Sequence, residues 1–215
     1  MHAVVDPTTP PLPDTPTLVG ERVQLVPLER SHVVGLAAAA AGARDTFTWT
    51  RVPDGIEDAE HYVEQLLEER ARGTVVPFAQ LDADGRVIGA TRYMHLRHRD
   101  GVASPYAVEI GGTWLAAGSQ RTGANVEAKL LLMSHAFEQW DVGRVDLRTD
   151  ARNERSRTAI AALGATFEGV LRAWQPSHVV GEESLLRDSA MYSVLAREWP
   201  SVRRGLAARL RRELA

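Results

Sequence analysis

Residues 111–132 read GGTWLAAGSQRTGANVEAKLLL, a strand-like apolar run that breaks into small residues and continues as an amphipathic helix. The first N–H groups of a helix have no partners within the helix and carry positive partial charge. A bare, glycine-containing turn before a helix therefore lets backbone amides surround phosphate oxygens. The turn has neither the P-loop pattern nor the dinucleotide-binding G-x-G-x-x-G pattern, which argues against a nucleoside triphosphatase.

Composition limits the chemistry that such a site could perform. The chain has 215 residues and no cysteine, which excludes disulfides, thiolate nucleophiles and cysteine-based metal sites. Its net charge of -3 gives no electrostatic reason to expect nucleic acid or an anionic membrane as a partner. No G-x-S-x-G motif supports a serine hydrolase. His95 and His98 would face opposite sides of a strand, so no metal site is expected.

Hydrophobic periodicity and turn residues predict the elements that position the glycine-containing turn. An Asp-Gly pair at residues 84–85 predicts a hairpin, and the Gly111-Gly112 pair predicts a bulge in the strand before the turn. Strands are expected at residues 17–28, 74–85, 86–96, 106–116, 144–151, 166–175 and 188–196, and helices at 29–42, 56–73, 123–140, 153–165 and 198–214. This order predicts a mixed α/β sheet with helices on both faces.

The domain organisation follows from composition along the chain. Residues 1–16 are rich in proline and threonine and are expected to form a disordered tail. Residues 17–200 contain no repeat or composition shift and are expected to form one domain, and residues 201–215 complete a basic amphipathic helix that packs on or continues it. No segment resembles a signal peptide or reaches the roughly 20 apolar residues of a membrane span, so a soluble cytoplasmic protein is expected.

The turn is similar to the acyl-CoA signature of the GCN5-related N-acetyltransferases (GNAT), Q/R-x-x-G-x-G/A. Residues 120–124 (QRTGA) fit this pattern, and Asn125 replaces the last small residue. A second stretch, DARNERSRTAIAALGA at residues 150–165, resembles the family's next motif, with Asn153, Ser156 and Gly164 in the matching places. Together with FEGVLR from Phe167 and RDSAMYSVLAREWP from residue 187, these motifs resemble the ribosomal-protein N-terminal acetyltransferase (RimJ/RimL-like) branch over about residues 17–200.

The resemblance implies a single-domain GNAT fold, whose mostly antiparallel sheet has a splayed parallel pair at its centre that admits the pantetheine arm. Residues 17–200 would then be an acetyltransferase domain with acetyl-CoA as co-substrate. A homodimer is a further option, because relatives often form one. The cofactor-binding residues that the resemblance implies are Trp114, Leu115, Gln120, Arg121, Thr122, Gly123, Ala124, Asn125, Val126, Asn153 and Ser156. Backbone N–H groups would bind the pyrophosphate and the pantetheine or thioester carbonyl, and the Asn153 side chain would bind pantetheine.

Acetyl transfer needs a neutral amine, a stabilised oxyanion and a proton for the leaving thiolate. By the resemblance, Glu109 is the base that withdraws the amine proton through water, and the alternative is an exposed strand carboxylate without a role. Glu168 and Asp150 are weaker candidates. Ile160 stands where many relatives have a proton-donating tyrosine, so Ser156 becomes the candidate donor, with a helix-capping hydroxyl as the alternative.

An α-amine has a pKa of about 7.7–8.0, against about 10.4 for lysine, so it needs only a weak base. The hypothesis is therefore an N-acetyltransferase acting on a protein N-terminus or a small-molecule amine. Without cysteine, transfer would occur by direct attack in a ternary complex. The candidate acceptor pocket contains Phe47, Trp49, Arg51, Arg172 and Trp174, and simple packing is the alternative explanation for its aromatic residues.

Two other functions stay open. An acetyltransferase for an antibiotic of the aminoglycoside type would need an acidic pocket, and Glu57, Asp58 and Glu60 form only a weak cluster. A catalytically silent acyl-CoA-binding regulatory module is the other option, since the family tyrosine is replaced by Ile160. Binding of acetyl-CoA without turnover would identify the silent module.

Overall fold

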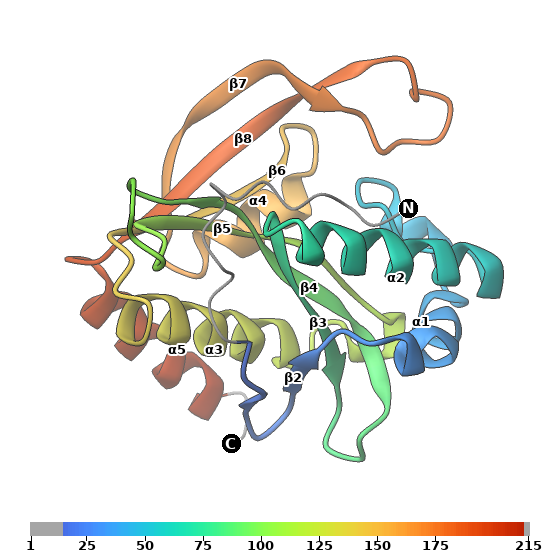
Figure 1. Cartoon of the computed structure of the whole chain (residues 1–215), viewed down its shortest axis with the longest axis horizontal. Coiled ribbons are helices and arrows are strands. Elements are labelled where there is room, and N and C mark those ends of the chain that lie inside the picture. The colour runs from blue at the N-terminus through green and yellow to red at the C-terminus, as the bar shows by residue number, and fades with distance from the viewer. Residues whose placement is uncertain (1–14, 213–215) are drawn as a thin grey trace.

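The structure is a computed structural model that describes residues 15–212. Its strands are β1 (Leu18–Val19), β2 (Gln24–Pro27), β3 (Val75–Leu81), β4 (Val87–Arg97), β5 (Ala107–Leu115), β6 (Arg144–Asp150), β7 (Thr166–Pro176) and β8 (Leu186–Leu195). Its α-helices are α1 (Val33–Ala40), α2 (Gly55–Ala71), α3 (Ala124–Glu138), α4 (Glu154–Ala161) and α5 (Trp199–Arg212). Short 3-10 helices lie at Arg30–His32, Arg44–Phe47 and Ala117–Ser119. Figure 1 shows the sheet running through the molecule between these helices.

The strands form one sheet in the order β1-β2-β3-β4-β5-β6-β8-β7. Neighbours are antiparallel except β5 and β6, which run parallel. These two strands pair over only three positions, from Ala107 opposite Arg144 to Glu109 opposite Asp146. Beyond Glu109, β5 continues to Leu115 and β6 to Asp150 without pairing with each other, so the sheet opens at its centre. The predicted mixed sheet with a splayed parallel pair is confirmed.

Helices cover both faces of the sheet. Side chains alternate along each strand and therefore pack into two separate hydrophobic cores, one on each face. On one face, Tyr93 of β4 packs with α3 and its hydroxyl donates to the Leu132 carbonyl at 2.6 Å. On the other face, Ala90 of the same strand packs with α1 and α2. Helix α3 is also covered by α5, where the rings of Phe137 and Trp199 stack 5.2 Å apart.

The first predicted strand, residues 17–28, is wrong as a single element. It forms a short hairpin of β1 and β2, with Gly20 N–H donating to the Val23 carbonyl at 2.9 Å. The cause lies far along the chain, because the buried Glu127 carboxylate of α3 accepts the N–H groups of Glu21, Arg22 and Val23. The helix predicted for residues 29–42 is also shorter, since it begins as a 3-10 turn and α1 ends at Ala40.

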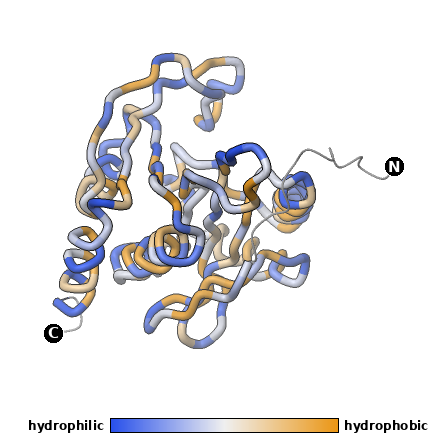
Figure 2. Tube along the Cα trace, turned by 60° about the vertical axis from the view of Figure 1, so that its left-hand side comes forward, coloured by the Kyte–Doolittle hydropathy of each residue, from blue (hydrophilic) through white to orange (hydrophobic). Residues whose placement is uncertain are grey.

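The C-terminal basic helix packs on α3 along its apolar side. Leu206 and Leu210 are buried, Trp199 Nε1 donates to Glu138 Oε1 at 2.9 Å, and Arg203 pairs with the same carboxylate. Figure 2 shows hydrophilic and hydrophobic residues alternating along this helix. The tail predicted for residues 1–16 lies almost entirely outside the described residues. No helix within residues 15–212 is both long and apolar enough to cross a membrane.

Candidate active site

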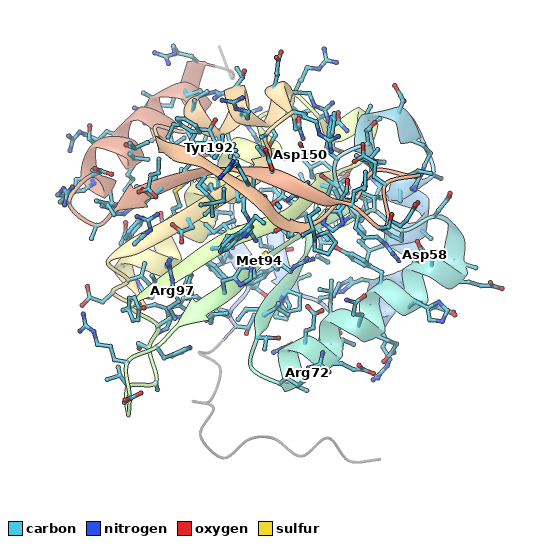
Figure 3. All side chains as sticks on the ribbon, turned by 90° about the horizontal axis from the view of Figure 1, so that it is seen from above. Asp58, Arg72, Met94, Arg97, Asp150 and Tyr192 are labelled. Carbon is cyan, nitrogen blue, oxygen red and sulfur yellow. The ribbon has the colours of Figure 1, made fainter. Side chains whose placement is uncertain are left out.

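A cavity of about 600 Å³ passes through the opening between β5 and β6. One side of its wall comes from α3 and α4, including Asn125, Asn153 and Ser156. The other side comes from α2 and the segment before it, including Phe47 and Tyr62. Two molecules could therefore enter from opposite faces of the sheet and meet beside β5. Figure 3 shows the β7–β8 hairpin lying over this part of the sheet.

The predicted bulge in β5 lies on this wall. The register with β4 shifts between Ala90 and Arg92, and Gly112 has a φ of +56°, a left-handed conformation that favours glycine. A Cβ atom on Gly112 would lie 2.5 Å from Arg92 Cζ, so the missing side chain makes room for this guanidinium. The bulge thus sets the path of β5 and the position of Arg92.

The turn before α3 forms one end of the cavity, which is called the donor end because the residues expected to bind the acyl donor lie there. Of the residues predicted there, Trp114, Leu115, Gln120, Arg121, Asn125 and Asn153 line the cavity, whereas Thr122, Gly123, Ala124 and Val126 lie next to it at the helix start. Gly123 is the N-cap, with a φ of +86° and no capping side chain. Asn125 Oδ1 is buried and accepts no hydrogen bond from any described residue. An N-terminus without a cap, beside an unsatisfied acceptor, suits a ligand with both phosphate and amide N–H groups.

Gln120 and Arg155 hold a neighbouring loop against the turn. Gln120 Nε2 donates to Thr46 Oγ1 and to the Leu115 carbonyl, each at 3.1 Å. Arg155 Nη2 donates to the Thr46 carbonyl at 2.8 Å. The loop before α2 is therefore fixed to the donor end, which places Phe47 in the cavity wall.

The second motif contributes to the same side of the cavity through α4. Asn153 is its N-cap, with Oδ1 accepting the Ser156 N–H at 3.0 Å. The cap is thus the asparagine side chain and not the Ser156 hydroxyl, which removes the alternative explanation for Ser156. Ser156 faces the cavity, and Ile160 is buried in the same wall.

Glu109 lies at the last paired position of β5, where the opening begins. The residue is 5% exposed, and burial raises the pKa of its carboxyl above the ordinary value. Arg148 of β6 opposes this change, with its Nη2 atom 3.2 Å from Glu109 Oε1. The alternative, a plain exposed carboxylate, is therefore wrong. The Glu109 carboxylate is buried, has a cationic partner and faces the cavity. The weaker base candidates are engaged elsewhere, Glu168 with Arg144 and Asp150 with Arg152.

The predicted acceptor residues are only partly brought together. Phe47, Trp49 and Arg51 line the cavity, whereas Arg172 and Trp174 do not. Both lie on the edge strand β7, where Trp174 is 52% exposed and its ring centroid lies 5.9 Å from Cζ of the cavity-lining Arg148.

Sequence reasoning missed several cations of the cavity wall. Arg92, Arg148 and Arg187 come from β4, β6 and β8, and Lys129 comes from α3. Lys129 is 5% exposed and donates to Thr113 Oγ1 at 2.6 Å, and burial lowers the pKa of its amine to about 7. A signal was present for Arg92, which interrupts the mostly apolar run VIGATRYM of β4. The convergence of these cations depends on strand order and register, which no single segment reveals.

The profile of the acetyltransferase (GNAT) domain matches residues 22–166, about two thirds of the chain. This chain belongs to the GNAT acetyltransferase family. Enzymes of the family use acetyl-CoA, so the acyl-CoA signature that was recognised around residues 120–125 is consistent with the fold in which it lies.

Solved structures share this fold over nearly the whole chain. A protein described as an acetyltransferase from T. thermophilus is 33% identical, with 90% of this chain and 96% of that chain covered and a TM-score of 0.75. A GCN5-related N-acetyltransferase from Brucella melitensis is 28% identical, with 94% and 89% covered and a TM-score of 0.80.

The branch expected from the sequence has the same fold. Mycobacterium smegmatis RimJ in complex with CoA-disulfide is 19% identical, with 90% of this chain and 94% of that chain covered and a TM-score of 0.75. A comparison with curated protein sequences gave no match.

Proposed function

We propose that this GNAT protein moves an acetyl group from acetyl-CoA to a primary amine of a protein N-terminus or a small molecule, by direct attack in a ternary complex. The observation that carries the proposal is the buried Glu109 carboxylate at the point where β5 and β6 part. It lies in a cavity whose walls come from both faces of the sheet. The absence of cysteine supports direct transfer, because no thiolate could carry the acetyl group.

The residues at the donor end fit acetyl-CoA, which would supply an activated thioester. The N–H groups at the start of α3, from Arg121 to Val126, would bind its pyrophosphate. Asn125 Oδ1, buried without a partner among the described residues, would accept an amide N–H of the pantetheine arm. Asn153 uses its carbonyl for the helix cap, which leaves its amide group for the same arm. Backbone N–H groups of Trp114 and Leu115 would bind the pantetheine or thioester carbonyl.

Glu109 would remove the proton from the attacking amine, directly or through one water. Its pKa is raised by burial, which makes the carboxylate a stronger base than an exposed glutamate. Arg148 keeps the side chain oriented toward the cavity by the ion pair at 3.2 Å. As the nitrogen–carbon bond forms and the carbon–sulfur bond breaks, the proton ends on the carboxylate.

The departing thiolate must receive a proton or a hydrogen bond. Ser156 lies in the cavity wall and is not needed for the helix cap, so its hydroxyl would position the sulfur. Because a serine hydroxyl is a poor acid, Ser156→Ala should lower kcat by only about tenfold or less, whereas loss of a general base costs about 10²–10⁴-fold.

The test measures binding and transfer on the same protein. Acetyl-CoA is titrated calorimetrically, and free thiol is then followed after adding peptides with free N-termini or small amines. Thiol release with one acetyl group added to the acceptor nitrogen would support the proposal. Binding without transfer to any acceptor would overturn it in favour of a silent acyl-CoA-binding module. No binding of acetyl-CoA would contradict the donor site itself.

A further inference from the structure

We infer that the acceptor half of the cavity is an anion site, formed by Arg92 and Arg187, which selects small primary amines that also carry a carboxylate or a phosphate. The inference names the acceptor class of the proposed N-acetyltransferase and rests on that proposed function. It derives from two guanidinium groups that face the cavity and form no hydrogen bond or ion pair with any of residues 15–212.

Four charged side chains form a row across neighbouring strands. The order β4-β5-β6-β8 places Arg92, Glu109, Arg148 and Arg187 on adjacent strands of the sheet. Residues an odd number of positions away on the same strands, namely Tyr93, Ile110, Leu147 and Ala190, belong to the core on the α3 face. Because strand side chains alternate, the row points to the opposite face, toward α2. All four members line the cavity.

Two members of the row form an ion pair, and the other two have no ion-pair partner among the described residues. Arg148 and Glu109 form an ion pair with each other. Arg187 is only 9% exposed, and neither Arg187 nor Arg92 has a hydrogen bond or ion pair with any residue in the range 15–212. The nearby acid Asp150 is bound by Arg152 through both its oxygens. A buried guanidinium without a hydrogen bond or ion pair is costly, and burial lowers the pKa of Arg187 although the charges of Asp150 and Glu109 oppose this change.

The acetyl-CoA phosphates are not suited to fill this site. Their expected position, the start of α3, has its own arginines in Arg121 and Arg155 at the donor end. Arg92 and Arg187 lie on the other face of the sheet, around the base that must receive the amine. An anionic group attached to the acceptor would therefore place the amine near Glu109 by pairing with the two guanidiniums.

The same charges argue against a polycationic acceptor such as an aminoglycoside. Six arginines line the cavity, Arg51, Arg92, Arg121, Arg148, Arg155 and Arg187, and the only acidic residues among its lining side chains are Glu69 and Glu109. A polycation would meet repulsion from most of this wall.

The test uses acceptors that differ only in charge. Alanylalanine, its C-terminal amide and its analogue ending in phosphonate are titrated calorimetrically into the CoA-saturated protein. We expect one or both anionic forms to bind about ten- to a hundredfold more tightly than the amide, as a charged hydrogen bond predicts. The carboxylate and phosphonate forms distinguish the two kinds of anion. Equal affinity for all three, or no binding of any, would overturn the inference.

Two variants and a control locate the site. Arg187→Met and Arg92→Met should each weaken binding of the preferred anion about tenfold and leave the amide unchanged, whereas Arg172→Met on the exposed edge strand should change neither. Arg187→Met should also unfold at a higher urea concentration, because it removes a buried charge that forms no ion pair within residues 15–212. If both variants weaken the amide equally, the arginines serve the structure and the anion site is wrong.

Transfer assays on the same acceptors separate this inference from the proposed function. Selective anion binding without acetylation would support the anion site and overturn the transferase. Acetylation of the amide as readily as of the anions would support the transferase and overturn the anion site.

Discussion

Replacing Lys129 by methionine should stabilise the protein, and the gain should depend on pH. Lys129 is the only lysine in the chain and lies buried between α3 and β5. Its hydrogen-bond partner is the neutral Thr113, which in turn pairs with Thr91 at 2.8 Å, and no carboxylate in the described chain forms an ion pair with it. Burial thus lowers the pKa of the amine from 10.5 to about 7.

The size of the effect follows from linkage. The pKa of the amine is 10.5 in the unfolded chain and about 7 in the folded one. At about 1.4 kcal/mol for each pH unit, this difference sets an upper limit of about 5 kcal/mol on the free-energy cost of burying the charged amine. Below pH 7 the amine is charged in both states and the cost of burying it is complete. Between pH 7 and 10.5 the unfolded state holds a proton that the folded state lacks, so the wild-type stability rises with pH.

Methionine keeps the unbranched shape of the lysine stem, is one heavy atom shorter, and does not titrate. Allowing for relaxation and for the lost hydrogen bond, we expect Lys129→Met to be about 2–4 kcal/mol more stable at pH 6 and about equal to wild type at pH 10. Urea denaturation at both pH values measures the difference, with Arg172→Met on the exposed edge as a control. A side-chain resonance of isotopically labelled lysine would report one residue and should titrate near pH 7. A difference in stability that stays constant across this range would refute the reasoning.

Three further variants test the elements that position the site. Gly112→Ala should destabilise the protein by about 1–3 kcal/mol in urea denaturation, because the new Cβ requires a left-handed conformation and collides with Arg92; Gly118→Ala, which meets nothing within 4 Å, should be nearly neutral. Glu127→Gln should cost about 2–3 kcal/mol of unfolding free energy, since the carboxylate accepts three backbone N–H groups of the β1–β2 turn; an unchanged denaturation midpoint would contradict this. Asn153→Ser should keep the helix cap and the stability but weaken acetyl-CoA binding about tenfold by calorimetry; equal affinity would remove Asn153 from the donor site.

Local signals in the sequence predicted much of the fold. The Asp-Gly hairpin forms, with Gly85 at a φ of +77°, and the Gly111-Gly112 pair marks a real bulge. The start of α3 was predicted within one residue, because its turn chemistry is contained in the sequence around Gly123. In each case the information lies within a few residues of the feature.

The errors share a different cause, which is contact between distant segments. The first strand breaks because Glu127 binds its backbone from more than 100 positions away. In α3, Leu130 is only partly buried, while Ala128 and Leu132 are fully buried. Helix α5 covers α3 on another side, where Phe137 stacks on Trp199. The arginine row likewise depends on strand order, which periodicity does not determine.

The most direct test of the central claim is the effect of Glu109→Gln on catalysis and on binding, measured separately. The account predicts that kcat falls about 10²–10⁴-fold while the Kd for acetyl-CoA stays within about twofold. It also predicts that the wild-type rate falls as pH drops through the raised pKa of Glu109 and that the variant lacks this limb. Glu64→Gln, an exposed carboxylate on α2, is the control and should behave as wild type. A variant that keeps its kcat, or loses acetyl-CoA affinity in parallel with activity, would contradict the assignment of Glu109 as the base.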